Sequence, residues 1–425
     1  MHKTLLIRSY RGPLLSHLIR TAWDAGWAVA MAPEKISGTD TASIRAALDG
    51  TVMEATMEGI RMMTGNLPSQ PEMESIDRWI HRYTLPAGRD PYPWPEDECA
   101  LVLFTSGSTG SPRGVCHSRG NILRSARLFV EHFGLTESDR LLCLAPAHTM
   151  SGFRSLLLPS VRVRHIHGES SFLSLVEQIR GMQATIVLCG PVFIRQLAAW
   201  ADRLTAHLQS LRGLLCTGAD LNQADRSRVE HVLGIPVLDY YGLTETAGLV
   251  LGDTFVQRSP GCLPAPCKGV ETILNPVNRE NGIFELAISS PNLFLGYLGS
   301  RLARRNIFNT GDLVQTNGDH CLKLLGRRSG AVKAPSTEWI HPQRLEIWLR
   351  AHLEQVSDAV ARAVPVPGGQ GLELWIDSRE DFDTVRIEEQ IVAQLGNDYR
   401  PVRWHFSRIE RTPLGKLSAL RQENE

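Results

Sequence analysis

The chain has 425 residues and a mass of 47.2 kDa, enough for two or three domains with sizeable hydrophobic cores. Its 45 Lys and Arg residues balance 45 Asp and Glu residues, so it lacks the basic excess of a protein that binds nucleic acid by electrostatics. No stretch approaches the ~20 apolar residues that cross a bilayer, and the apolar patch before Ser9 is too short for a signal peptide, which favours a cytoplasmic protein.

The cysteines do not form the compact pattern of a disulfide framework. Eight of them are spread over the chain, which fits a reducing compartment. Cys262 and Cys267 lie closest together, but four residues separate them and no second pair follows, unlike in a zinc knuckle. We therefore expect buried or half-buried thiols at these two positions.

The first clear boundary is the connector Pro86–Pro95, because proline neither donates to a sheet ladder nor continues a helix. An apolar run predicts a strand at 100–104. The Gly- and Ser-rich segment Thr105–Gly114 follows, and a helix is predicted over 118–133. This segment is therefore expected to connect a strand to a helix.

Strands and helices alternate in the central part of the chain. Apolar runs predict strands at 141–145, 185–188, 214–217 and 237–240. Helices are predicted between several of them, at 172–182, 192–208 and 222–233. The alternation favours a parallel sheet covered by helices, in which ligands bind beyond the carboxyl ends of the strands.

The pattern changes after Gly326. Helices are predicted at 342–353 and 384–395, and apolar runs at 356–364, 372–376 and 402–406. We therefore expect an α/β fold in which residues 1–326 form a large N-terminal domain of parallel and mixed sheets covered by helices. Residues 327–425 would form a small, mobile C-terminal α+β domain that follows a hinge at 327–330.

The segment Thr105–Gly114 is suited to binding phosphate, since its glycines and hydroxyl residues offer donors without bulky side chains. It is not a Walker loop, because no Gly-Lys-Ser/Thr follows. It is not a nucleophile elbow either, because Ser106 stands where a glycine is required before Ser108. Taken alone, such a segment is more often a solvated loop.

Three further segments accompany it: Asp239–Gly248, Phe308–Asp312 with the later Gly326-Arg327, and Arg411–Lys416. In this order the four segments resemble those of the adenylate-forming (AMP-binding) superfamily. That superfamily comprises acyl- and aryl-CoA synthetases, adenylation domains of peptide synthetases, and luciferases. The resemblance extends from about Ala100 to Leu417.

The resemblance implies an ATP site. The β- and γ-phosphates would be held by Thr105, Ser106, Gly107, Ser108, Thr109 and Gly110. Arg113 stands where the family usually has lysine, which replaces a point charge by a planar fork. The adenosine would be bound by Tyr241 stacked on adenine, by Asp239, Gly218 and Ala219 along the base, and by Asp312 with Arg327 at the ribose.

The resemblance also implies the catalytic residues. Thr244 would contact the α-phosphate, and Glu245 would be the ligand of Mg²⁺. Lys416 would reach the acyl carboxylate and the α-phosphate, where a cation stabilises the developing charge. Each residue also has an ordinary structural explanation: Tyr241 as a core aromatic, Glu245 as an acid in the first turn of a helix, Asp312 as a turn residue, Lys416 as a surface lysine.

His148 lies in Ala145–Gly152, which resembles the family's histidine-containing stretch at the acyl pocket, so it would gate access of the carboxylate; a lone histidine after a strand is otherwise structural. Thr149 stands where amino-acid-activating members carry Asp, which leaves an aryl or aliphatic carboxylic acid as substrate. The stretch also resembles the o-succinylbenzoate–CoA ligase branch. Arg154 could then meet a second carboxylate, although a surface arginine is the commoner explanation.

The sequence departs from the family at the hinge. Ser329 replaces the expected Asp, and the glycine expected after Lys333 is replaced within Ala334–Thr337. That glycine belongs to the loop along the pantetheine tunnel, so the thioester-forming step is less firmly implied than adenylation. Only 104 residues precede the phosphate loop, so we expect the chain to be shortened at its N-terminal end relative to the family.

The resemblance thus implies an ATP- and Mg²⁺-dependent, AMP-forming acid–thiol ligase. Its partners would be a small non-amino carboxylic acid and the phosphopantetheine thiol of CoA or of an acyl carrier protein. One alternative is an o-succinylbenzoate-type CoA ligase, and another is an adenylating enzyme or nucleotide-binding module with an impaired thioester step. An amidase-type hydrolase would leave the Tyr241–Glu245 segment and Asp312 unexplained.

Overall fold

The structure is a computed structural model, and not every residue is described. The described residues are 3–8, 14–33, 44, 47–48, 51–56, 58–63, 73–86, 89–105, 113–165, 171–219, 221–279, 281–316, 318, 321–336, 339–353, 355–378, 383–411 and 417–422. Among them, no helix is long and apolar enough to cross a membrane.

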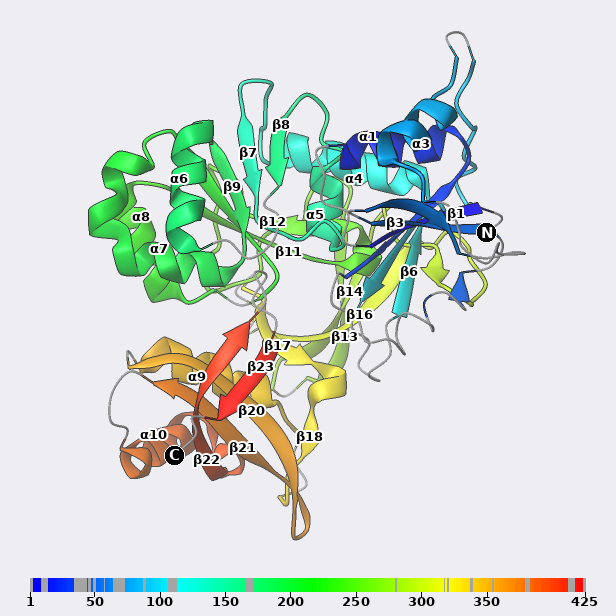
Figure 1. The fold of residues 1–425 in the computed structure, drawn as a ribbon. Helices are drawn as coiled ribbons and strands as arrows, with labels where there is room; N and C mark the ends of the chain where they lie inside the picture. Colours follow the sequence, from blue (N-terminus) through cyan, green and yellow to red (C-terminus); the bar gives the residue numbers. More distant parts are fainter. Residues whose placement is uncertain are drawn as a thin grey trace.

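The first sheet is mixed and has seven strands in the order β15-β6-β5-β2-β1-β3-β4. Their bounds are β1 Lys3–Arg8, β2 Ala28–Ala32, β3 Thr51–Thr56, β4 Gly59–Met62, β5 Leu101–Thr105, β6 Arg113–His117 and β15 Gly296–Tyr297. Successive side chains of a strand point to opposite faces, so Leu5 and Leu6 belong to different hydrophobic clusters. The Leu5 side is covered by α1 (Leu15–Asp24), α3 (Ile76–Tyr83) and α4 (Arg119–His132) (Figure 1).

The second sheet has six strands in the order β12-β11-β10-β9-β7-β8, and all pairs except β11–β12 are parallel. Their bounds are β7 Arg140–Cys143, β8 Arg162–His165, β9 Ile186–Cys189, β10 Gly213–Cys216, β11 Val237–Leu243 and β12 Gly248–Gly252. One face packs against α6 (Phe172–Met182), α7 (Pro191–Leu204, continued by η1, Thr205–His207) and α8 (Gln223–Leu233). The other packs against α4 and α5 (Met150–Ser155). The parallel sheet predicted from the alternation is confirmed.

The third sheet is antiparallel, in the order β13-β14-β16-β17, with bounds β13 Glu271–Asn278, β14 Ile283–Ser289, β16 Ile307–Gln315 and β17 Lys323–Arg327.

A disulfide between Cys262 and Cys321 links the loop before β13 to the loop before β17. The expectation of a thiol at Cys262 is therefore wrong, while Cys267 is a buried free thiol as expected. The pairing was missed because the two residues are 59 positions apart.

Residues from Val332 onward form a separate lobe with its own hydrophobic cluster (Figure 1). A four-stranded sheet, in the order β20-β21-β22-β23, lies with two helices. The bounds are β18 Val332–Lys333, β19 Trp339–Ile340, α9 Pro342–His352, β20 Val356–Val366, β21 Gly369–Ser378, α10 Thr384–Leu395, η4 Asn397–Tyr399, β22 Pro401–Arg411 and β23 Leu417–Gln422. The predicted helices and apolar runs of the tail all lie on these elements. The domain boundary at 326/327 itself stays a prediction.

The Gly- and Ser-rich segment does not connect a strand to a helix as expected. It connects the antiparallel strands β5 and β6, with Thr105 opposite Arg113. The short strand β6 is buried between β5 and β15, and a Cβ on Gly114 would come within 2.9 Å of Leu298 Cβ. α4 begins only after β6, where the Ser118 hydroxyl accepts a hydrogen bond from Asn121 N and caps the helix.

Candidate functional site

Thr244 and Glu245 lie where the first two sheets meet. They form the 3-10 turn η2 (Thr244–Thr246), directly after β11. The backbone oxygen of Thr244 is 2.8 Å from Nε2 of His117, at the end of β6. Burial lowers the pKa of His117 to about 4, so the neutral ring donates this hydrogen bond. His117 therefore links Thr244, which the resemblance places at the α-phosphate, to β6, the strand that follows the predicted phosphate-binding segment.

Tyr297 joins Glu245 to Arg113. Its hydroxyl donates to Glu245 Oε1 at 3.0 Å, and the Arg113 guanidinium lies 4.8 Å from the centre of its ring. Burial, followed by the charge of Glu245, raises the pKa of Tyr297, so the phenol stays neutral. Glu245 is half-buried and Arg113 is exposed. A carboxylate and a cation thus both contact one tyrosine, an arrangement suited to a metal-bound polyphosphate.

Tyr241, Asp312 and Arg327 form a continuous chain of contacts. The Tyr241 hydroxyl donates to Asp312 Oδ2 at 2.5 Å, and Arg327 Nε lies 2.7 Å from Oδ1. Asp312 faces Arg327 across β16 and β17 and is 5% exposed. Burial raises the pKa of Asp312, and Arg327 opposes that shift. Burial also raises the pKa of Tyr241 well above its usual value. These residues, far apart in sequence, form one group.

The residues expected along the adenine base follow neighbouring strands. Gly218 and Ala219 are exposed after β10, and Gly218 has a φ of 102°. Asp239 lies in the next strand, where its carboxylate pairs with the buried Arg226, and its backbone NH donates to Asp253 Oδ2 at 3.0 Å. The carboxylate of Asp239 is thus held by a structural ion pair, two positions before Tyr241.

His148 is half-buried in the turn between β7 and α5. Thr149 caps α5 by accepting a hydrogen bond from Gly152 N, and a Cβ at Gly152 would lie 2.0 Å from Pro146 O. The turn is therefore tight and needs glycine. Arg154, at the end of the same helix, is 0% exposed, so the interpretation of this residue as a surface arginine is wrong.

Six of the expected site residues lie outside the described residues: Ser106, Gly107, Ser108, Thr109, Gly110 and Lys416. Thr105 and Arg113 are paired across β5 and β6, and Arg113 contacts the ring of Tyr297. Arg411, at the end of β22, precedes the segment with Lys416 and forms an ion pair with Asp358 at 2.5 Å. Arg411 and Ala219 line one small cavity, so the end of β22 in the C-terminal lobe lies close to a residue expected along the adenine base.

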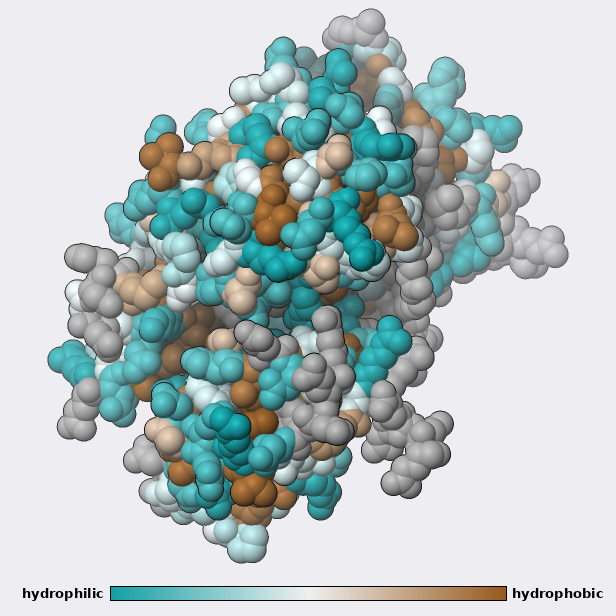
Figure 2. Space-filling model, turned by 90° about the vertical axis from the view of Figure 1, so that its left-hand side faces the viewer, coloured by the Kyte–Doolittle hydropathy of each residue, from teal (hydrophilic) through white to brown (hydrophobic). Residues whose placement is uncertain are grey.

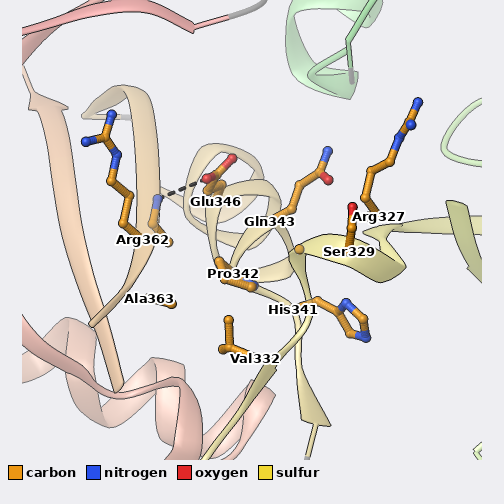
Figure 3. A pocket seen from close by; sticks show the side chains of 12 residues that line it. Arg327, Ser329, Val332, His341, Pro342, Gln343, Glu346, Arg362 and Ala363 are labelled. Atoms are coloured by element: carbon orange, nitrogen blue, oxygen red, sulfur yellow. Dashed lines mark hydrogen bonds between the residues drawn. The ribbon is translucent and has the colours of Figure 1, made fainter. Parts of the chain in front are cut away.

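A second cavity, of about 400 Å³, lies at the predicted hinge (Figure 3). It is lined by Arg327 and Ser329 on one side and by residues of α9 and β20 on the other, among them Gln343, Glu346 and Arg362. Glu346 Oε1 accepts a hydrogen bond from Ala361 N at 2.9 Å. The Ser329 that replaces the family's Asp is exposed toward this open space.

A family model described as "AMP-binding enzyme" matches residues 25–298, more than half of the chain. The chain belongs to the AMP-binding enzyme family. This confirms the expected superfamily and, with it, the interpretation as an AMP-forming acid–thiol ligase.

Its relatives in this family are acid–CoA ligases. The 2-succinylbenzoate–CoA ligase of Enterococcus faecalis is 27% identical over 338 residues, which cover 76% of this chain and 68% of that enzyme. A feruloyl-CoA synthase of Amycolatopsis is 29% identical over 59% of this chain and 53% of that enzyme.

Solved structures of family members share the fold. An anthranilate CoA ligase in complex with anthranoyl-AMP gives a TM-score of 0.81 at 19% identity and covers 98% of this chain and 86% of that chain. The o-succinylbenzoate CoA synthetase of Bacillus subtilis with its acyl-adenylate gives 0.77 at 19%, over 98% and 87%. The expected α/β fold class is confirmed.

Sequence reasoning missed three contacts of this site. His117, Tyr297 and Arg226 belong to none of the four segments that carry the resemblance. Their roles depend on partners 127, 52 and 13 positions away, respectively. No local pattern in the sequence marks such pairs.

Proposed function

We propose that this member of the AMP-binding family is a cytoplasmic, Mg²⁺-dependent ligase that adenylates a non-amino carboxylic acid and transfers it to a phosphopantetheine thiol. The observation that carries the proposal is the contact of three sheets around Thr244 and Glu245, with His117 and Tyr297 from the first sheet and Asp312 from the third close by. CoA is the favoured thiol because the relatives are CoA ligases, and a carrier protein is the alternative.

The chain Tyr241–Asp312–Arg327 would hold the nucleoside. A carboxylate offers about four lone-pair sites, so Asp312 can accept ribose hydroxyls while it keeps its bonds to Tyr241 and Arg327. Tyr241 would stack on adenine from β11, and Gly218 and Ala219 would leave the approach to the base open.

Arg113, Thr244 and Glu245 would bind the polyphosphate and its metal. Mg²⁺ prefers one or two carboxylates together with substrate phosphates, so a single carboxylate at Glu245 fits the ion. When bound, Mg²⁺ would neutralise charge on the phosphates. Tyr297 would orient Glu245 through its 3.0 Å hydrogen bond, and Arg113 would neutralise further phosphate charge.

The reaction would then follow in two steps. The substrate carboxylate, admitted past His148, attacks the α-phosphorus, and the bond to pyrophosphate breaks. Lys416 would stabilise the charge on the oxygens of that transition state. In the second step the thiol sulfur attacks the acyl carbon, its proton is lost, and AMP leaves.

We also propose that residues 327–425 move as a unit between the two steps, about Arg328 and Ser329. The altered segment Ala334–Ser336 stays with that unit. A Cβ on Gly369 would lie 2.8 Å from the backbone of Ala334 and Pro335, and the Ser336 hydroxyl donates to Asp398 at 2.7 Å. These contacts hold the segment to the small lobe.

The test is acid-dependent exchange of labelled pyrophosphate into ATP, with a panel of aryl, fatty and dicarboxylic acids. We expect exchange with at least one acid, and we expect Lys416→Ala to slow it at least a hundredfold, as loss of a transition-state contact does. Exchange without any acid dependence, or none with any acid, would contradict the ligase. Nucleotide binding without exchange would favour the nucleotide-binding module, and ATP-independent amide hydrolysis the amidase. Unchanged exchange in the variant would remove Lys416 from its role.

A further inference from the structure

The disulfide between Cys262 and Cys321 joins the second and third sheets at their edges. Cys262 lies in the loop that follows β12, the edge strand of the second sheet. Cys321 lies two positions before β17, the edge strand of the third sheet. Beside the disulfide, Leu263 N donates a hydrogen bond to Leu322 O at 2.7 Å. One covalent bond and one backbone hydrogen bond therefore connect the two sheets at this point.

The same two sheets also meet at the proposed nucleoside site. Tyr241 lies on β11, opposite Leu251 of the neighbouring β12, and its hydroxyl donates to Asp312 at 2.5 Å. Asp312 lies on β16, opposite Arg327 of the neighbouring β17. The disulfide thus connects the loops next to β12 and β17, and each of these strands is hydrogen-bonded to a strand that carries one partner of the Tyr241–Asp312 contact. A shift of β17 away from β12 therefore changes the distance between these two partners.

Cys262 and Cys321 differ from the other cysteines in exposure. Both are half-buried, so a small thiol can approach their sulfur atoms, whereas the six other cysteines are free and buried. Burial raises the pKa of Cys267, the free cysteine nearest to Cys262 in the sequence, to about 12. Cys267 therefore stays a thiol and does not attack the disulfide, because the thiolate is the attacking species. Thiol–disulfide exchange is thus confined to one pair of cysteines.

A disulfide has a particular meaning in the compartment proposed for this protein. In the cytoplasm, glutathione and thioredoxins keep thiols reduced, and the disulfides that do form there are usually transient or redox-sensing. Six free cysteines beside one disulfide agree with such a setting. A permanent structural disulfide would instead be typical of a secreted protein.

We infer that the Cys262–Cys321 disulfide is a site of reversible thiol–disulfide exchange that controls the affinity of the proposed nucleoside site for ATP. The reductant is a cellular thiol of the glutathione or thioredoxin class. The inference rests on the proposed ATP site and adds a means of regulating it.

The exchange is balanced in two steps. A thiolate of the reductant attacks one sulfur of the disulfide, the S–S bond breaks, and the other cysteine leaves as a thiolate that takes up a proton. A second thiolate of the reductant then attacks the mixed disulfide and releases the remaining cysteine, which is protonated in turn. The reductant supplies two electrons and becomes a disulfide. Reduction frees β17 from β12, so Asp312 is held less firmly opposite Tyr241 and ATP binds less tightly.

The test compares ATP binding by the oxidised and the reduced full-length chain. Protein treated with oxidised glutathione and protein treated with excess reduced glutathione are titrated calorimetrically with ATP, at a temperature at which circular dichroism shows both folded. We expect the Kd for ATP to be roughly fivefold or more higher in the reduced form, the lower end of typical coupling between sites, and to recover on reoxidation. Cys262→Ser combined with Cys321→Ser should bind ATP as the reduced wild type does in either buffer. Cys267→Ala, the matched control, should keep the response.

Two further measurements separate this regulation from a purely structural role. Alkylation under native conditions, read by mass spectrometry, should label Cys262 and Cys321 in the reduced protein alone. In pyrophosphate exchange, reduction should raise the KM for ATP and leave the KM for the acid unchanged, whereas a general loosening of the fold would raise both.

The possible failures are distinct from one another. A disulfide that excess glutathione leaves intact, an equal ATP affinity in both forms, or an equal rise of both KM values overturns the inference and leaves the ligase intact. If reduction unfolds the protein, or lowers Tm without changing the ATP affinity, the disulfide is structural and the inference fails. ATP binding in neither form contradicts the proposed nucleotide site and the inference together.

Discussion

At the scale of single residues, the proposed nucleotide site contains a carboxylate, Asp312, in an unusual environment. Burial raises the pKa of Asp312, while Arg327 and the Tyr241 hydroxyl favour its ionised form. The two partners occupy different oxygens, so each can be removed separately. In its proposed role, Asp312 would have to be ionised to accept hydrogen bonds from both ribose hydroxyls.

ATP binding should therefore weaken as pH falls through the raised pKa of Asp312. The pH at which the affinity falls should lie above the usual pKa range of an aspartate. Tyr241→Phe removes a hydrogen bond that lowers the pKa of Asp312, so the loss of ATP affinity should begin at a still higher pH in the variant. Calorimetric titration with ATP at a series of pH values measures this pH dependence in the wild type and in the variant. If the affinity falls at the same pH in wild type and variant, the coupling between Tyr241 and Asp312 is contradicted. Tyr83→Phe, at a distant tyrosine of α3, is the control.

At the scale of elements, the carboxylate of Asp139 connects the N-terminal ends of three strands of the second sheet. Asp139, just before β7, accepts from Arg212 Nε at 2.8 Å, from the Thr185 hydroxyl at 2.7 Å and from Thr136 N at 2.8 Å. Thr185 precedes β9 and Arg212 precedes β10. Burial alone would raise the pKa of Asp139, but these hydrogen bonds outweigh it and lower the pKa to about 2.

Arg212→Met should lower the free energy of unfolding at pH 7 by about 2 kcal/mol, the size of a charge-assisted hydrogen bond. A carboxyl group whose pKa is lowered on folding stabilises the fold above its unfolded pKa, and this contribution is lost as pH falls toward 2. The difference between wild type and variant should therefore shrink below pH 4 in urea unfolding curves. A difference that is independent of pH would show that Arg212 acts through packing alone.

At the scale of the whole molecule, the side chain of one asparagine contacts both lobes. Asn222 Nδ2, in the first lobe, donates to Arg350 O of the second at 2.6 Å, while Arg328 at the predicted hinge pairs with Glu285 of the first lobe at 2.7 Å. Asn222 is also the N-cap of α8, where its Oδ1 accepts from Ala224 N at 2.8 Å. The side-chain NH₂ of Asn222 therefore makes the contact between the lobes, and its side-chain oxygen caps α8.

Asn222→Asp keeps the cap and removes the donor to Arg350. We expect Tm to change by no more than about 1 °C and pyrophosphate exchange to slow several-fold, because the described arrangement of the lobes is less favoured. Thioester formation from supplied acyl-AMP should be unaffected or faster. Equal slowing of both half-reactions would contradict this assignment, and Asn222→Ala, which also loses the cap, shows the effect of a weakened helix.

Much of this arrangement follows from local pattern. The short apolar runs of the second sheet and the helices at 172–182 and 384–395 are where the sequence predicts them. The third sheet was missed because β13 and much of β14 are only partly buried, so their apolar content is diluted. Tyr297, His117 and the burial of Arg154 depend on packing between distant segments, which local pattern does not encode. The grouping of Tyr241, Asp312 and Arg327 could be expected only from the family resemblance.

The disulfide gives the chain a topology that differs from that of a simple linear polymer. Cys262 and Cys321 close a covalent ring that contains β13, β14 and β16 of the third sheet and also β15, the edge strand of the first sheet. The residues Tyr297 and Asp312 both lie inside this ring. A single peptide-bond cut within it would leave one covalently joined molecule, so the strands around the proposed nucleotide site would survive a nick that separates an ordinary chain into two fragments.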